Sequence, residues 1–173
     1  MNIIITCARH LEPETKEEIT KILGEMGDME PEVTITSMSG ILTAKTSLDP
    51  IEVVRKMKES VEDEPWSLRY CLRVIPIQKV SETSQEGIEK ITEELIPQIS
   101  SDETYRISIE KRNSNISSQE MITKIAQKIK NKVSLEHPDK VIQIEILGAR
   151  TGVSVIKRSD VLSVEKTKRS MSE

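Results

Sequence analysis

The spacing of apolar and polar residues divides the first part of the chain into alternating strands and helices. Short apolar or alternating runs predict strands over residues 2–8, 33–36, 41–44 and 68–80. Apolar residues at steps of three and four predict helices over residues 11–26 and from residue 49 to the break at residues 63–65. The resulting order, β-α-β-β-α-β, predicts an N-terminal ferredoxin-like domain over residues 1–80 of an α+β protein.

A second series of elements follows a joint at residues 81–83. The same criteria predict a helix over residues 84–99, a strand from residue 105, a helix from residue 117 to about residue 133, and strands over 141–147, 153–156 and 161–164. A glycine-bracketed turn is expected at residues 148–152. The order α-β-α-β-β predicts a second, α/β domain over residues 81–166, and residues 167–173 are expected to form a flexible, basic tail.

Polar residues ahead of apolar runs predict where three of the helices begin. Asp49 precedes Pro50 and is a good N-cap. Thr15 with Glu18, and Ser117 with Glu120, have the spacing of capping boxes.

One corner of the second domain concentrates cations. Lys111, Arg112 and Asn113 lie between a predicted strand and the helix that Ser117 begins, in a segment too polar for a core. A helix N-terminus beside two cations suits an anion, and a nucleic-acid phosphate is the chemistry that fits. Gly148 and Gly152 bracket Arg150 and could cradle a phosphate; a turn with positive φ is the alternative.

The charge is distributed unevenly along the chain. Residues 1–103 hold 11 Lys+Arg against 21 Asp+Glu, and residues 104–173 hold 14 against 8, so the two parts carry −10 and +6. Such asymmetry indicates an anionic partner for the basic part. An unevenly charged solvated surface is the alternative.

The aromatic content limits how RNA could be recognised. The chain has no Phe, and its aromatics are Trp66, Tyr70 and Tyr105. The predicted central strands of the first domain contain none, which excludes an RRM, because that fold stacks bases on aromatics of its central strands. Recognition would depend on charge, on backbone hydrogen bonds and on nucleic-acid shape.

The sequence predicts a cytoplasmic, non-membrane protein. No apolar run approaches the length of a membrane span, and residues 1–7 are interpreted as a first strand and not as a signal peptide. Cys7 and Cys71 each lie among apolar neighbours, so we expect two buried free thiols.

The search for catalytic chemistry gives a negative result. His10, His137 and the two cysteines have no metal-ligand spacing, and no glycine-rich nucleotide loop or nucleophile elbow is present. We therefore expect no metal, no cofactor and no enzyme acting alone.

Several short motifs, in order, resemble a known family. They are Arg69-Tyr70-x-x-Arg73-x-x-Pro76-Ile77, Tyr105-x-Ile107 leading to Lys111-Arg112-Asn113, and Pro138 before Val141-x-x-Ile144-Glu145-Ile146. They are similar to the THUMP domain of the small tRNA-acetylation adaptor proteins. Thr6-Cys7-Ala8-Arg9-x-Leu11-Glu12 resembles the opening of the ferredoxin-like domain that precedes THUMP in many RNA-modifying enzymes.

The resemblance implies a tRNA-binding adaptor. THUMP domains bind the 3′ acceptor end of tRNA, and in the adaptor branch a separate tRNA cytidine acetyltransferase forms N4-acetylcytidine. The chain ends soon after the last expected THUMP strand, which agrees with that branch. The resemblance assigns RNA binding to Lys111, Arg112 and Asn113, with Lys157 and Arg158 on the neighbouring strand end and Arg73 and Arg150 as second choices.

Two other functions stay open. The chain could be a catalytic subunit of an RNA-modifying enzyme that completes its site with a partner or cofactor. It could also be a structural interaction module whose basic surface matches an acidic protein.

Overall fold

The structure is a computed structural model that describes residues 1–171 of the 173-residue chain. Contacts between its Cα atoms divide the chain into two compact units. The first unit holds Met1–Ile77 together with the chain from Ser159 onward, and the second unit holds Gln78–Arg158. The two terminal segments of the chain therefore belong to the same unit.

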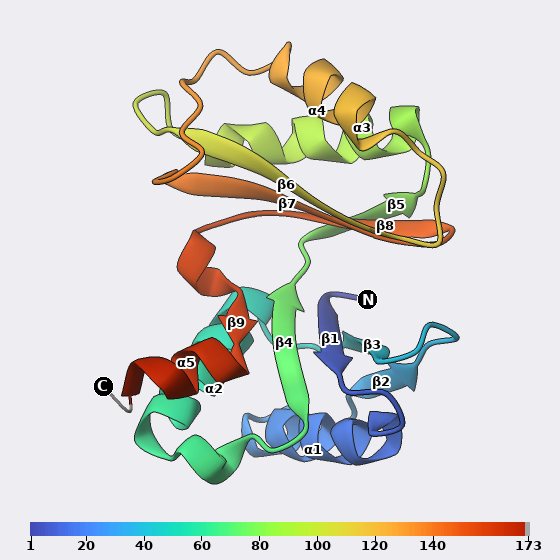
Figure 1. The fold of residues 1–173 in the computed structure, drawn as a ribbon, viewed down its shortest axis with the longest axis vertical. Coiled ribbons are helices and arrows are strands. Elements are labelled where there is room, and N and C mark those ends of the chain that lie inside the picture. The colour runs from blue at the N-terminus through green and yellow to red at the C-terminus, as the bar shows by residue number, and fades with distance from the viewer. Residues whose placement is uncertain (172–173) are drawn as a thin grey trace. The chain divides into compact units, whose positions relative to one another are not determined.

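The first unit is an antiparallel sheet with two helices packed on one face (Figure 1). Its elements in chain order are β1 (Ile3–Cys7), α1 (Glu12–Glu25), β2 (Glu32–Ile35), β3 (Ile41–Lys45), α2 (Pro50–Asp63), the 3₁₀ turn η1 (Pro65–Ser67) and β4 (Cys71–Pro76). The strands lie in the order β2-β3-β1-β4, and β9 (Leu162–Ser163) extends the sheet beside β4. The predicted α+β class and the β-α-β-β-α-β order are confirmed.

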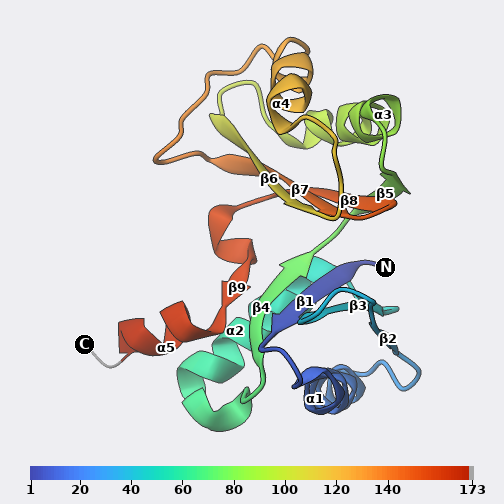
Figure 2. The ribbon, with the colours of Figure 1, turned by 45° about the vertical axis from the view of Figure 1, so that its right-hand side comes forward.

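The second unit is a four-stranded mixed sheet in the order β5-β8-β7-β6. Its elements are β5 (Lys79–Glu82), α3 (Gln85–Leu95), η2 (Ile96–Gln98), β6 (Tyr105–Arg112), α4 (Ser118–Ala126), β7 (Lys140–Leu147) and β8 (Arg150–Ile156). The β6–β7 pair is parallel, and the other pairs are antiparallel. Figure 2 shows α3 and α4 on the same face of this sheet, where they cover a core built on Ile142, Ile144 and Ile146 of β7.

Residues 68–80, expected as one strand, form two strands in two different sheets. β4 ends at Pro76, which has no N–H to donate to a sheet ladder. The N–H of Ile77 donates to the carbonyl of Asn2 in the first unit, and the N–H of Gln78 donates to the carbonyl of Val153 in the second. The chain therefore passes from one sheet to the other between two consecutive residues. The apolar pattern continues across this point, which is why the sequence predicted a single strand.

The segment after residue 158 differs from the expected end of the second domain and from the expected flexible tail. Leu162 of β9 pairs with Val74 of β4 and is fully buried. The 3₁₀ turn η3 (Arg158–Asp160) precedes it, and the helix α5 (Val164–Met171) follows and contacts α2. Arg55 Nε lies 2.9 Å from Asp160 Oδ1, and Lys168 Nζ donates to the carbonyl of Leu68 at 2.9 Å. Residues 172–173 of the expected tail lie outside the described residues.

The predicted helix from residue 117 to about 133 is shorter in the structure. After α4 ends at Ala126, the chain continues in tight turns in which Lys128 N donates to Ile125 O and Ile129 N donates to Ala126 O. Ile129 is still buried, so the apolar residues keep their helical spacing beyond Ala126. The backbone there no longer forms an α-helix. The expected turn at residues 148–152 is also shorter, because β8 begins at Arg150 and Gly152 pairs with Glu145 inside the sheet.

Two of the three predicted helix starts are confirmed. The Asp49 side chain accepts a hydrogen bond from Ile51 N, and the Ser117 side chain accepts one from Glu120 N. The prediction of a capping box at Thr15 and Glu18 is wrong. Thr15 is buried within α1 and its hydroxyl donates to the carbonyl of Leu11, while Glu18 binds backbone amides beyond α2.

The buried position of Leu162 generates a stability prediction. Leu162→Ala should lower the free energy of unfolding of the first unit by about 2–5 kcal/mol, because a fully buried leucine leaves a cavity when truncated. Met171→Ala, at an exposed position, is the control. Urea unfolding followed by circular dichroism measures both. A loss for Leu162→Ala no larger than that of the control would show that β9 does not pack into the first unit.

Candidate nucleic-acid interface

One end of the second sheet gathers the residues that the sequence marked as an anion corner. β6 runs parallel to β7, so its last residue, Arg112, pairs with Leu147 at the end of β7. The turn from β7 to β8 follows at once, and Gly148 N donates to the carbonyl of Arg112 at 2.8 Å. Gly148 has φ +59, which a glycine adopts without strain. We call residues 82–85, 111–118 and 148–150 the helix-start end of the second sheet.

Both helices of this unit begin at the helix-start end (Figure 1). Glu82, the last residue of β5, pairs with Arg150, and Thr83 N donates to the carbonyl of Ala149 at 2.9 Å. The N-cap Ser84 then begins α3, and the N-cap Ser117 begins α4 after the short loop from β6. Each N-terminus presents backbone N–H groups and a partial positive charge, which favours anions. The sequence alone gave both helix starts but not their placement at one end.

Lys111 lies near the end of β6, and Asn113 begins the loop that leads from β6 to α4. The Lys111 ammonium donates to the carbonyl of Ile116 at 2.9 Å, which folds the loop back toward the start of α4. Both residues are exposed, and Asn113 has a positive φ of 53°, a conformation that asparagine tolerates better than most residues. Arg150 is exposed at the start of β8, and within residues 1–171 its side chain has no hydrogen bond or ion pair.

Arg112 has a different role from the other two cations. Its Nη1 lies 2.9 Å from Oε2 of Glu145, a residue with no exposed surface, and Gln143 Nε2 donates to the other carboxylate oxygen at 2.9 Å. The Arg112 side chain is 23% exposed. A buried carboxylate requires such a partner, because an unpaired buried charge is strongly destabilising. Arg112 therefore holds β6 to β7.

Lys157 and Arg158 do not lie on a strand end beside Lys111, as the sequence suggested. β8 runs antiparallel to β7, so its last residue, Ile156, pairs with Val141 at the opposite end of the sheet, about 20 Å from Arg150. There Arg158 donates to the carbonyls of Glu136 and Leu135. Arg73 belongs to β4 of the first unit. The structure thus brings together Lys111, Arg112, Asn113 and Arg150 at one end of the second sheet, places Lys157 and Arg158 beyond its opposite end, and assigns Arg73 to the other unit.

The division into units also changes the charge distribution. The first unit holds 12 Lys+Arg against 17 Asp+Glu, and the second holds 13 against 12. The units therefore carry −5 and +1, because the acidic segment 78–103 belongs to the second unit, while residues 159–173 carry no net charge. Attraction of an anion to the second unit must come from the local arrangement at the helix-start end and not from net charge.

Comparison with known families locates the THUMP signature. The family model of the THUMP domain matches residues 82–156, a segment within the second unit. The chain contains a THUMP domain. The helix-start end, with β6 through β8 and the last residue of β5, therefore lies within the matched segment.

Known proteins resemble the chain beyond that segment. An uncharacterized protein of Methanocaldococcus jannaschii, MJ0421, is 28% identical over 126 residues, which cover 70% of this chain and 35% of that protein. The crystal structure of PH1313 from Pyrococcus horikoshii is similar with a TM-score of 0.68 and 18% identity, over 91% of this chain and 55% of that one. The chain thus spans about a third to a half of the length of these relatives.

Two further crystal structures share the fold. TrmN from Thermus thermophilus has a TM-score of 0.59 and 13% identity, over 90% of this chain and 45% of that one. A Listeria monocytogenes protein described as a predicted N6-adenine-specific DNA methylase has a TM-score of 0.53 and 14% identity, over 90% of this chain and 40% of that one. At these identities the likeness concerns the fold alone.

The cysteines and histidines form no chemical centre in the described part of the chain. Cys7 and Cys71 are both buried and free, as predicted, and burial raises the pKa of each thiol. No group of three or more His, Cys, Asp or Glu residues within 1–171 could hold a metal ion. No helix in that range is long and apolar enough to cross a bilayer.

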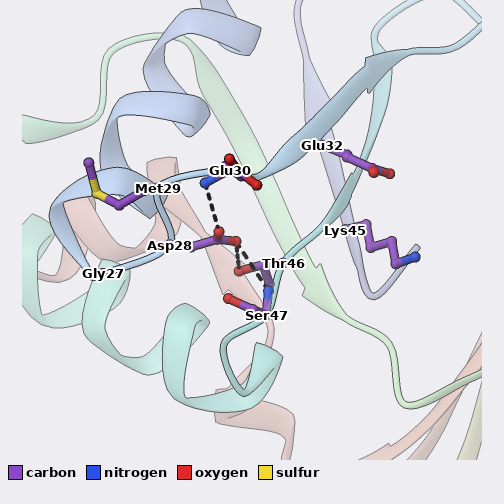
Figure 3. A pocket seen from close by; sticks show the side chains of 8 residues that line it. All are labelled: Gly27, Asp28, Met29, Glu30, Glu32, Lys45, Thr46 and Ser47. Atoms are coloured by element: carbon purple, nitrogen blue, oxygen red, sulfur yellow. Dashed lines mark hydrogen bonds between the residues drawn. The ribbon is translucent and has the colours of Figure 1, made fainter.

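The polar residues that line a cavity of about 490 Å³ in the first unit have a structural role (Figure 3). At its wall, the Asp28 carboxylate accepts hydrogen bonds from the Thr46 hydroxyl at 2.6 Å, from Ser47 N and from Glu30 N. These bonds lower the pKa of Asp28, and the bond from the Thr46 hydroxyl has the largest effect. Asp28 therefore ties the loop before β2 to the loop after β3.

The Arg112–Glu145 pair generates a prediction that separates stability from binding. Arg112→Glu should lower the free energy of unfolding by about 3–5 kcal/mol, because it places a second carboxylate against a buried one. Lys111→Glu should cost about 1 kcal/mol or less, since its single bond is exposed. Urea unfolding measures both.

A double replacement is the control for this pair. Arg112→Leu with Glu145→Leu should recover much of the stability lost in Arg112→Glu, because no buried charge is left. Equal stability of wild type and Arg112→Glu would show that the pair does not hold the strands.

Proposed function

We propose that the chain is an RNA-binding protein whose THUMP domain holds tRNA at the helix-start end. The observation that carries the proposal is the coincidence of two helix N-termini with exposed Lys111 and Arg150 at one end of the domain that matches the THUMP family. Backbone N–H groups and two cations at one end of a domain are suited to binding successive phosphates.

The aromatic content of the domain favours contacts with the RNA backbone. Tyr105 is the one aromatic residue between residues 78 and 158, and it is buried. Base stacking on exposed rings is therefore absent from this domain, so phosphate and 2′-hydroxyl contacts must dominate. The family resemblance adds the 3′ acceptor end of tRNA as the ligand. A tRNA trimmed of its 3′-terminal nucleotides should then bind more weakly than intact tRNA.

We further propose that the chain is a non-catalytic adaptor, which presents tRNA to a separate cytidine acetyltransferase for N4-acetylcytidine formation. The support is the resemblance of the sequence motifs to the adaptor branch and the buried, protonated state of both thiols, which removes the strongest nucleophiles from solvent. Holding the target cytidine near the partner's active site raises its local concentration.

A second candidate function is the RNA-binding part of a different RNA-modifying enzyme. It is favoured by the fold likeness to a protein described as a predicted methylase, of which this chain spans 40%. In that case the catalytic site would be completed by a partner or cofactor, and the group transferred would be methyl and not acetyl.

The RNA-binding proposal predicts a position-dependent effect of charge reversal. Lys111→Glu and Arg150→Glu should each weaken tRNA binding, and each lost phosphate contact should lower the slope of log affinity against log salt by roughly 0.7–0.9. Lys157→Glu, at the opposite end of the sheet, is the control with the same charge change and should alter the slope less. Fluorescence anisotropy of labelled tRNA at several salt concentrations gives these slopes. Equal effects of all three variants would place the RNA elsewhere.

The adaptor proposal predicts the outcome of a reconstitution. The purified chain with tRNA and acetyl-CoA should form no acetylcytidine, and addition of a tRNA cytidine acetyltransferase should produce it. Lys111→Glu should reduce the yield mainly at limiting tRNA, because a binding defect is overcome by more ligand. Mass spectrometry of digested tRNA detects the product. Acetylcytidine formed by the chain alone would identify an enzyme, and methylation with S-adenosylmethionine and a partner would favour the second candidate.

A further inference from the structure

The turn η1 presents an aromatic side chain to solvent in the first unit. Trp66 is the single tryptophan of the chain, and it is 69% exposed. Arg69 and Tyr70 follow it in the same loop and line the same cavity. Trp, Tyr and Arg are the residue types that most often carry the binding energy of protein interfaces. Three of them in one loop, with the tryptophan exposed, indicate a contact surface for a partner.

The loop is held in place by a carboxylate of α1. The Glu18 side chain accepts hydrogen bonds from three consecutive backbone N–H groups, those of Arg69 at 2.8 Å, Tyr70 at 3.2 Å and Cys71 at 3.1 Å. Trp66 thus lies on a loop that is hydrogen-bonded to a helix. The backbone of this loop is already ordered before a partner binds. Such pre-organisation lowers the entropic cost of binding.

A groove runs from the tryptophan along α1. A cavity of about 690 Å³ lies between α1 and the Trp66 loop, and a second cavity of about 470 Å³ lies between α1 and α2. The two share Ile22, Glu25 and Ser67, so they are continuous. Ile22 and Met26 are partly buried at the edge of the first core, which gives the groove an apolar floor.

The rim of this groove is acidic. Four glutamates of α1 line the larger cavity against Lys21 and Arg69; they are Glu14, Glu17, Glu18 and Glu25. The first unit as a whole has five more acidic than basic residues. A phosphate backbone would be repelled here, whereas a Lys or Arg side chain would meet carboxylates and could stack on the Trp66 ring.

We propose that this surface binds a segment of a partner protein in which Lys or Arg side chains flank an apolar residue. The apolar residue fits the floor at Ile22 and Met26, and the cations contact the glutamates and Trp66. The proposal goes beyond RNA binding and does not depend on it, because it concerns residues of the first unit alone.

The test is a titration with a short synthetic peptide that carries Arg and Leu at helical spacing. The full chain should bind it saturably, with a change in the emission of Trp66 and weaker binding as salt rises. Fluorescence anisotropy of the labelled peptide should show about tenfold weaker binding to Trp66→Ala and to Glu17→Lys with Glu25→Lys. A peptide with Glu in place of Arg should not bind.

A matched charge reversal is the control. Glu30→Lys with Glu32→Lys makes the same change of charge on the same unit, at exposed residues beside the Asp28 cavity. It should weaken peptide binding less than twofold if the contact is local. Equal loss in both double variants, or no saturable response of Trp66, overturns the proposal.

Other occupants would be recognised in the same experiments. A response of Trp66 to an RNA oligonucleotide that Trp66→Ala abolishes would replace the protein partner with nucleic acid. Self-association of the chain that is lost in Glu17→Lys with Glu25→Lys would replace it with a second copy. Lys111→Glu leaves the peptide titration unchanged if the proposal holds, whatever its effect on tRNA.

Discussion

The arrangement of the THUMP domain depends on a buried carboxylate. Glu145 has no exposed surface, and its oxygens are bonded by Arg112 at the end of β6 and by Gln143 on β7. The pair fixes the last residue of β6 against β7, and because these strands are parallel, the connection between them must cross over through α4. The end of β6 that carries Lys111, the loop that begins at Asn113 and the N-terminus of α4 therefore lie where Arg112 is held.

The first unit uses carboxylates in the same way. Glu18 binds three backbone amides and fastens the loop that carries Trp66, and Asp28 fastens two neighbouring loops to each other. In each unit, acidic side chains order loops, while other charged or aromatic groups such as Lys111 and Trp66 are left at the surface. Because of this separation of roles, we expect charge reversal at Lys111 to leave the fold intact.

The element types follow from the sequence because helical and strand periodicity is a local property, and the caps at Asp49 and Ser117 are local as well. Partners distant in the sequence were not predictable. Glu145 is 33 residues from Arg112, and the placement of Lys157 opposite Lys111 depends on the direction of β8. The change of sheet at Gln78 and the pairing of Leu162 with Val74 required the tertiary structure, because an apolar run predicts a strand but not the strand with which it pairs.

Hydrogen–deuterium exchange with and without tRNA tests the central claim most directly, because it reports where the RNA contacts the backbone. The account predicts slowed exchange at residues 82–87, 111–120 and 148–150, which include the N-termini of α3 and α4. Slowed exchange confined to residues 134–139 and 157–158, at the opposite end of the second sheet, or to the Trp66 loop would contradict it.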